Sequence, residues 1–320
     1  MAERKVVLLE QDDLMHPNTG ESNYNESAYY NFYDRERHVG GFARLGNRAN
    51  EGYAEMTVCF YLPDHTVGFM FGRPKIENNL AHDAGGLKFQ VLKPFEHHRV
   101  TYQGKLCILK NPLEMADPAA AFKSNPYAKA NLEIDYHATA PGWGGEMREK
   151  SGDAWVSIRN DGDAEAQFAK GHLEQLGHAV GRLVIGETEY KIDGLGLRDH
   201  SWGPRYWQAP KYYRWLTMNF DESLGGMATI TVNRDGSERP GGFIARKGQP
   251  YCAYPQSRGA DRIHRRAAAS RPDARHRMDL RQRRADRDYR QGDRDDSAAQ
   301  PARWNDHTNC RGHDRMAMGR

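Results

Sequence analysis

The feature that most constrains the fold is an alternation of apolar and polar residues that recurs between residues 27 and 250. Aromatic and β-branched side chains occupy every second position in short segments such as residues 28–34, 53–64 and 130–140. Turn residues, for example Asp-Gly pairs, separate these segments. A period of two puts successive side chains on opposite faces of a strand. The pattern predicts an all-β chain of about ten or more strands in antiparallel barrels or sandwiches.

Two interruptions of this pattern bear on the domain organisation. Residues 112–123 are Ala-rich and predict the one helical stretch, interrupted by Pro118. The polar run of residues 141–163 is the expected boundary between two β domains. We therefore expect four parts: an N-terminal segment of residues 1–20, a first β domain of residues 21–163, a second and truncated β domain of residues 164–250, and a tail of residues 251–320.

The composition of the tail differs sharply from the rest. Residues 251–320 contain 17 Arg and 10 Asp but no Lys, Glu, Val or Phe. Such a segment cannot build a hydrophobic core. One interpretation is a disordered Arg-rich tail that binds RNA or DNA electrostatically. The other is a GC-rich gene read out of frame, because back-translation and a one-base shift restore strand-like alternation without a stop codon. We hypothesise a frameshift near residues 251–252.

Charge and hydropathy limit the function classes. Of 46 basic and 43 acidic residues, 29 and 33 lie in residues 1–250, so a nucleic-acid partner is expected only if the tail is genuine. The sequence has no apolar run long enough to span a membrane and no signal peptide, so we expect a cytoplasmic protein. Cys59 and Cys107 lie among apolar residues and are predicted to be small buried hydrophobes.

The densest chemistry lies in residues 194–207, which read GLGLRDHSWGPRYW. On a regular strand Arg198, His200 and Trp202 share one face, and Asp199 points to the other. The simplest site therefore presents a cation, a titratable imidazole and an aromatic surface to a cavity. Asp199 would hold a partner from behind, either the second arginine of the run or a backbone amide. The alternative is a buried ion network of Asp199 and both arginines, with the tryptophans packed in the core.

Residues after this segment admit two interpretations each. Trp207, Tyr213 and Trp215 either line a ligand cavity or belong to the core. Asp221 follows a predicted strand, where it acts as a site acid or caps a turn. No phosphate loop or nucleophile elbow occurs, and the adjacent histidines near position 97 diverge on a strand. The sequence predicts neither a metal site nor a cofactor.

The run IDGLGLRDHSWGPRYW, with HLEQLG and RLVIGETEY upstream, resembles a group of bacterial proteins related to hydroxyneurosporene synthase (carotenoid 1,2-hydratase) and to the AttH-like proteins. Residues 29–64 and 83–106 resemble the N-terminal half of the same group. The resemblance covers roughly residues 20–250 and extends to the hydratases through the signature Asp-His-x-Trp-Gly. It implies two lipocalin-like antiparallel β-barrels side by side.

In the hydratases, the His and Trp of this signature and a downstream acid are implicated in adding water to a terminal isoprenoid double bond. The resemblance implies catalytic roles for His200 and Trp202, with Asp199 beside them and Asp221 as the downstream acid. We expect ligand contacts from Arg198, Arg205, Trp207, Tyr213 and Trp215. The expected function is a hydratase or isomerase, of the hydro-lyase class, for an isoprenoid or steroid-like molecule. The alternative is a non-catalytic lipocalin-like carrier of such a lipophilic ligand.

Resequencing the gene tests the frameshift hypothesis. We expect the shifted frame to stay open beyond codon 251 and to encode further segments with apolar alternation. Stop codons early in that frame would contradict the hypothesis and would favour a genuine tail.

Overall fold

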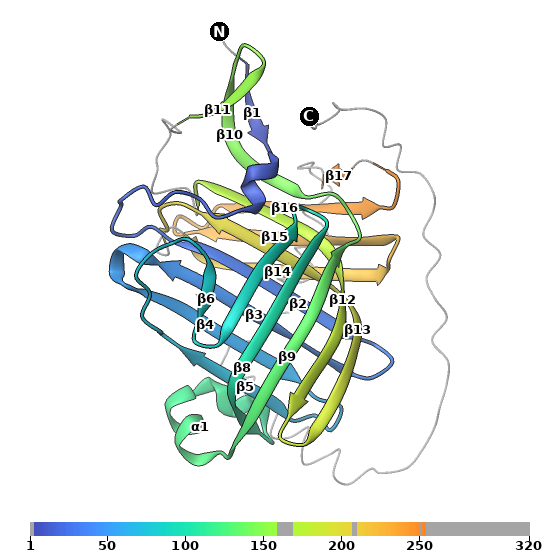
Figure 1. The fold of residues 1–320 in the computed structure, drawn as a ribbon. Helices are drawn as coiled ribbons and strands as arrows, with labels where there is room; N and C mark the ends of the chain where they lie inside the picture. Colours follow the sequence, from blue (N-terminus) through green and yellow to red (C-terminus); the bar gives the residue numbers. More distant parts are fainter. Residues whose placement is uncertain (1–2, 159–168, 207–209, 250, 254–320) are drawn as a thin grey trace. The chain divides into compact units, whose positions relative to one another are not determined.

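Strands make up most of the structure, a computed structural model that describes residues 3–158, 169–206, 210–249 and 251–253 (Figure 1). The prediction of an all-β chain is confirmed. The elements in chain order are β1 (Arg4–Val7), η1 (Glu10–Asp13), β2 (Glu26–Asp34), β3 (Val39–Arg48), η2 (Ala49–Glu51), β4 (Tyr53–Tyr61), β5 (Val67–Gly72), β6 (His82–Ala84), β7 (Leu87–Lys93), β8 (His97–Leu109), η3 (Pro112–Ala116), α1 (Pro118–Ser124), β9 (Tyr127–Ala138), β10 (Trp143–Ser151), β11 (Ala154–Ser157), β12 (Gly171–Ile185), β13 (Thr188–Trp202), β14 (Pro210–Asp221), β15 (Leu224–Asn233), β16 (Glu238–Arg246) and β17 (Cys252–Ala253).

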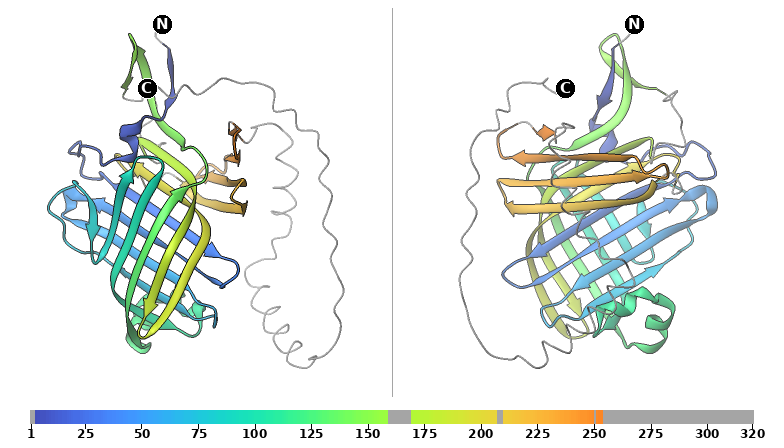
Figure 2. Two further views of the ribbon diagram at one scale, coloured as in Figure 1. Left: turned by 45° about the vertical axis from the view of Figure 1, so that its right-hand side comes forward. Right: turned by 180° about the vertical axis from the view of Figure 1, so that it is seen from behind.

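Eight strands close into an antiparallel barrel. In the order β2, β3, β4, β5, β8, β9, β12 and β13, each strand hydrogen-bonds to the next, and β13 pairs back with β2. The tilted strands of this barrel are visible from three directions (Figures 1 and 2). Closure gives every barrel strand a partner on both sides, the up-and-down arrangement found in lipocalins.

The strands on either side of the expected domain boundary belong to this one barrel. β12 and β13 follow residue 163 in the sequence, yet β12 pairs with β9 and β13 with β2. The polar run of residues 141–163 contains the β10–β11 hairpin. Alternation predicts where strands lie but not which strands pair, so the sequence pattern could not assign β12 and β13 to the first barrel.

The barrel interior is a packed hydrophobic core. Inward-pointing residues such as Leu45, Val58 and Leu132 are fully buried, and the aromatic rings of Tyr30 and Phe32 lie in the same cluster. A barrel of eight strands has an interior that side chains alone can fill. A ligand site is therefore expected at the ends or on the outer faces of the barrel.

A helical segment covers part of the outer surface of β4 and β8. The sequence predicted a helix over residues 112–123 with an interruption at Pro118, and the structure has η3 followed by α1, which begins at Pro118. Ala121 of α1 packs in one cluster with Cys59 and Cys107. Both cysteines are buried and free, which confirms the prediction that they act as small hydrophobes.

A second sheet, formed by β14, β15, β16 and β17, packs on the outer face of β12 and β13. Its Met227 and Phe243 share a buried cluster with Leu176 and Leu197 of the barrel. The expected Arg-rich tail begins at residue 251, and its residues from 254 onward lie outside the described part of the chain. Among the described residues, no helix combines the length and apolar character needed to cross a membrane.

Two adjacent carboxylates in η1 fasten the N-terminal segment to one end of the barrel (Figure 1). Asp12 accepts a hydrogen bond of 2.8 Å from the guanidinium of Arg148 on β10. Asp13 accepts one of 2.6 Å from Arg198 on β13, and lies 2.9 Å from a ring nitrogen of His98 on β8. Both carboxylates are fully buried, so these partners are what permits them to stay charged.

Replacing Asp13 by Asn tests this fastening. The change leaves Arg198 buried without its carboxylate, so we expect a loss of about 3–5 kcal/mol in the free energy of unfolding. Urea unfolding measures the loss. The control is Asp83→Asn on β6, where the exposed carboxylate pairs only with Lys88 and should contribute less than about 1 kcal/mol. Equal losses in the two variants would contradict the role assigned to Asp13.

Candidate functional site

β13 carries the residues singled out in the sequence on two opposite faces. Arg198, His200 and Trp202 are buried at the inner side, where they meet the N-terminal segment. Asp199 lies on the outer side, paired with a residue of β12. This division follows from the period of two along a strand. It produces two separate polar groups, an inner group and an outer group.

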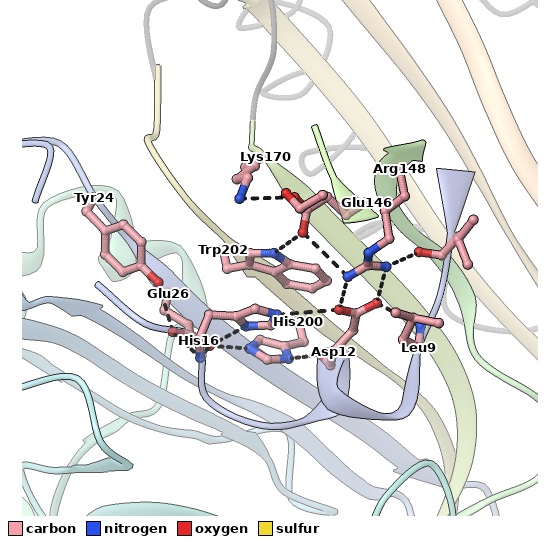
Figure 3. A network of polar contacts seen from close by, with 12 residues as sticks. Leu9, Asp12, His16, Tyr24, Glu26, Glu146, Arg148, Lys170, His200 and Trp202 are labelled. Carbon is pink, nitrogen blue, oxygen red and sulfur yellow. Dashed lines mark hydrogen bonds and ion pairs between the residues drawn. The ribbon is translucent and has the colours of Figure 1, made fainter. Parts of the chain in front are cut away.

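The inner group is centred on the carboxylate of Glu26 on β2. Nε2 of His200 lies 3.1 Å from Glu26 Oε1, and Nδ1 of His16 lies 2.9 Å from the same oxygen (Figure 3). Nδ1 of His200 lies 3.1 Å from the backbone carbonyl of Asp12. Burial raises the pKa of Glu26, but the two histidines lower it more, so the net pKa is well below its ordinary value. Glu26 is therefore a fixed anion.

Trp202 forms one wall of the inner group. Its ring stacks on His16 with centroids 4.0 Å apart, and its indole nitrogen donates to Glu146 at 3.4 Å (Figure 3). The ring lies so close to Gly171 on the paired strand that any side chain there would collide with it. Trp202 is only 2% exposed, so it contacts protein rather than an open cavity.

The two arginines of the motif occupy different surroundings. Arg198 donates to Gln175 at 2.8 Å as well as to Asp13, on the inner side. Arg205 is also buried, and it donates to Ser201 at 2.5 Å. Burial lowers the pKa of Arg205 to about 10, although the charge of Asp199 raises it. The sequence left open a single buried ion network of Asp199 and both arginines. In the structure the two arginines lie apart, because Arg198 belongs to the inner side and Arg205 lies near Asp199.

The outer group consists of Asp199 on β13 and of His172 and Glu174 on β12. His172 Nε2 makes a short contact with Asp199 Oδ2 and lies 3.5 Å from Glu174 Oε1. The indole nitrogen of Trp215 donates to Glu174 Oε1 at 3.1 Å. The second oxygen, Oε2, has no hydrogen-bond partner among the described residues. Glu174 is 3% exposed, and burial raises its pKa to about 7.

The charge state of the outer pair differs from that of Glu174. Burial lowers the pKa of His172, but the carboxylate of Asp199 raises it more, and the net pKa is above its ordinary value. The imidazole in turn lowers the pKa of Asp199 despite its burial. The pair is therefore ionic, while the neighbouring Glu174 exchanges its proton near neutrality. His172 is 40% exposed along its side chain, so the group is accessible to solvent.

Sequence reasoning missed His172 and Glu174, although the sequence contains a signal for them. β12 and β13 are joined by a two-residue turn, Gly186 and Glu187. The residue of β13 that pairs with a given residue of β12 therefore lies the same number of positions from the turn. That count pairs Glu174 with Asp199. Nothing in the sequence pointed to His16 or Glu26, because they come from the N-terminal segment and from β2.

The remaining expected residues are dispersed. Trp215 joins the outer group, whereas Tyr213 is 55% exposed two positions earlier on β14. Asp221 accepts hydrogen bonds from the backbone and hydroxyl of Ser223, which makes it a turn residue at the end of β14. Trp207 lies outside the described residues.

A cleft of about 610 Å³ is lined by residues of β2, β3, β4, β13 and β14 and of the turn between β2 and β3. The lining includes the aromatic rings of Tyr29, Phe42 and Tyr61 and the charged residues 34–37, but no residue of the outer group. The ring of Tyr29 contacts that of Trp215, with centroids 5.2 Å apart. Because Trp215 holds Glu174, the aromatic wall of the cleft is connected to the outer group through two rings.

Both groups have the spacing of metal ligands. One ligand atom from each of His16, Glu26 and His200 lies within 4.8 Å of the others, and the same holds for His172, Glu174 and Asp199. The sequence predicted no metal site, since each triad draws its members from separate strands or segments.

A family model described as "Domain of unknown function (DUF7064)" matches residues 9–257. The chain belongs to this family. The matched range includes η1, the whole barrel and both polar groups. The chain matches no curated protein at a significant level.

Solved structures with a similar arrangement include an AttH-like protein from Nitrosomonas europaea and kievitone hydratase from Nectria haematococca. The first is 11% identical with a TM-score of 0.48, covering 78% of this chain and 72% of that one. The second is 12% identical with a TM-score of 0.40, covering 79% and 72%. The AttH-like proteins are one of the two groups that the sequence motifs resemble.

Glu174 should make stability depend on pH. Its folded pKa of about 7 exceeds the ordinary 4.5, so its contribution is complete below pH 4.5 and is lost as the pH rises through 7. Relative to Glu174→Gln, the wild type should lose about 3 kcal/mol of unfolding free energy over this window. Urea unfolding of both proteins across the window measures the difference. Parallel pH curves would show that Glu174 titrates normally.

Proposed function

We propose that the protein is an acid–base enzyme of the hydratase or isomerase type that acts on a lipophilic small molecule at the outer group. The observation that carries the proposal is the buried carboxyl group of Glu174, held by Trp215 beside the ionic pair of His172 and Asp199. A proton donor, a base and an aromatic wall then lie within one connected set of side chains. The raised pKa of Glu174 supports the role of a proton donor at neutral pH.

Hydration of a double bond uses these parts in sequence. Glu174 protonates one alkene carbon, and positive charge develops on the other carbon. The ring faces of Trp215 and Tyr29 stabilise that charge. Water adds to the cationic carbon, and the protonated alcohol that forms gives its extra proton to the carboxylate of Asp199, which the imidazolium of His172 holds in place. Return of that proton to the carboxylate of Glu174 completes the cycle. An isomerase would follow the same path, with loss of a carbon-bound proton in place of water addition. Neither path requires a cofactor.

The expected catalytic residues take different roles in this proposal. Asp199 orients and charges His172, which makes it part of the acid–base set. His200 and Trp202 are 4% and 2% exposed and already contact the N-terminal segment, so they position the barrel end rather than touch substrate. Arg205 balances the charge of Asp199. Asp221 has no part in the reaction, because it is engaged in its own turn.

A non-catalytic carrier is the second candidate. The observation that favours it is the lining of the cleft, where Tyr29, Phe42 and Tyr61 offer an aromatic surface independent of any acid or base. A carrier would use this surface in the same way, and Glu174 would then serve only to hold Trp215.

The variant Glu174→Gln separates these functions. Purified protein is incubated with a panel of isoprenoid alkenes and steroid enones, and products are detected by mass spectrometry as a gain of one water or as an isomer. We expect the variant to bind ligand, measured by tryptophan quenching, but to lose about 10²–10⁴-fold in kcat. The matched control is Glu187→Gln in the exposed turn of the same hairpin, which should retain full activity.

Two results would overturn the enzyme assignment. Binding by the wild type without turnover of any panel member would favour the carrier. Full activity in Glu174→Gln, with loss in a folded His200→Gln variant, would move the chemistry to the inner group.

A further inference from the structure

The inner group brings together three nitrogen and oxygen ligands from distant parts of the chain. His16 precedes β2, Glu26 begins β2, and His200 lies near the end of β13. Both imidazoles reach the same carboxylate oxygen, at 2.9 Å and 3.1 Å (Figure 3). The three ligand atoms lie within 4.8 Å of one another, which is the spacing of ligands around one ion. Glu26 is completely buried, so this convergence is not a loose surface cluster.

Both ring nitrogens of His200 face oxygen atoms that can only accept a hydrogen bond. The Asp12 carbonyl that faces Nδ1 at 3.1 Å can only accept, so Nδ1 carries the hydrogen. A neutral His200 then points the lone pair of Nε2 at the carboxylate of Glu26, and two acceptors repel at 3.1 Å. Something positive must lie between them. It is either a second proton on the ring or a metal ion bound by both atoms.

Neighbouring polar groups hold His16, Glu26 and His200 in the way that supporting hydrogen-bond partners hold the ligands of metal sites. The second nitrogen of His200 faces a backbone carbonyl, which fixes the tautomer that exposes Nε2. The second nitrogen of His16, Nε2, lies 3.7 Å from an oxygen of the Asp12 carboxylate. This distance is too long for a hydrogen bond, but the negative charge of the carboxylate still acts on the ring. The other oxygen of Glu26 accepts from Tyr24 at 3.1 Å and from Asn79 at 2.5 Å. Partners of this kind hold ligands in place in metal sites.

We infer that His16, Glu26 and His200 bind a divalent first-row transition metal ion of the zinc or iron(II) type. Two imidazoles and one carboxylate suit such ions, whereas calcium and magnesium prefer all-oxygen sites. The outer group suits the role less well, because the cation of Arg205 lies near Asp199 and would repel a metal ion. The site is independent of the reaction proposed for the outer group.

The ion would have a definite structural effect. His16 belongs to the N-terminal segment, while Glu26 and His200 belong to adjacent barrel strands. Binding therefore ties that segment to the barrel and stabilises the folded chain in proportion to metal concentration. His16 is 14% exposed along its side chain, so it is the ligand nearest to solvent and the point of entry.

Metal binding by the full chain tests the inference. Protein stripped with a chelator is titrated with Zn²⁺ by calorimetry and with Co²⁺ by visible absorption, which reports nitrogen ligation. We expect one Zn²⁺ per chain and a rise in Tm with Zn²⁺. His16→Gln should weaken binding by at least roughly 100-fold, beyond the 10–100-fold typical of a lost supporting partner. Glu26→Gln, which keeps the side-chain volume, should act in the same way.

His172→Gln is the matched control, because it removes one histidine from the outer group and leaves the inner group intact. It should bind Zn²⁺ like the wild type. The inference is overturned if the wild type binds no stoichiometric metal, or if binding survives His16→Gln and disappears in His172→Gln. If His16→Gln fails to fold, the Zn²⁺ stoichiometry of the wild type and of His172→Gln still decides between the two groups.

Discussion

The carboxylates of Asp12 and Asp13 lie where water is excluded, and an unpaired charge there would cost several kcal/mol. Their cations come from β10 and from β13, the strand that closes the barrel. The N-terminal segment and the closed barrel therefore require each other. This requirement places Arg198 with its side chain inward and fixes which face of β13 carries each later residue, so the division into inner and outer groups follows from it.

Two glutamates show how strongly surroundings decide chemistry in this chain. Glu26 accepts from a backbone amide, Tyr24 and Asn79 and faces the imidazoles of His16 and His200. Burial raises its pKa, but these two histidines lower it more. Glu174 is almost equally buried but accepts, among the described residues, from Trp215, and burial raises its pKa to about 7. The same side chain is a permanent anion in one place and a proton donor in the other. The proposed metal ligand and the proposed catalytic acid are thus separated by one strand, β13.

The sequence predicted the all-β class, the interrupted helix at Pro118 and the burial of Cys59 and Cys107, because each depends on local pattern. The split of Asp199 from His200 and Trp202 also follows from alternation alone. The pairing of strands could not be predicted, because the hydrogen bonds between β13 and β2 join residues more than 160 positions apart. The partners of His200 were hidden for the same reason, as His16 and Glu26 carry no motif. The proposed metal ligands and the buried carboxyl group of Glu174 come together only when segments distant in the sequence meet.

The two-residue turn at Gly186 and Glu187 sets the register in which β13 pairs with β12. Side chains alternate along β13, so a slip of one position exchanges the faces of the whole strand. If β13 slipped by one position against β12 and β2, Asp199 would point inward and His200 and Trp202 would face the second sheet. Both groups would be lost together, although no residue in either had mutated. The register that the tight turn and the two neighbouring strands hold therefore decides on which face of β13 each group lies.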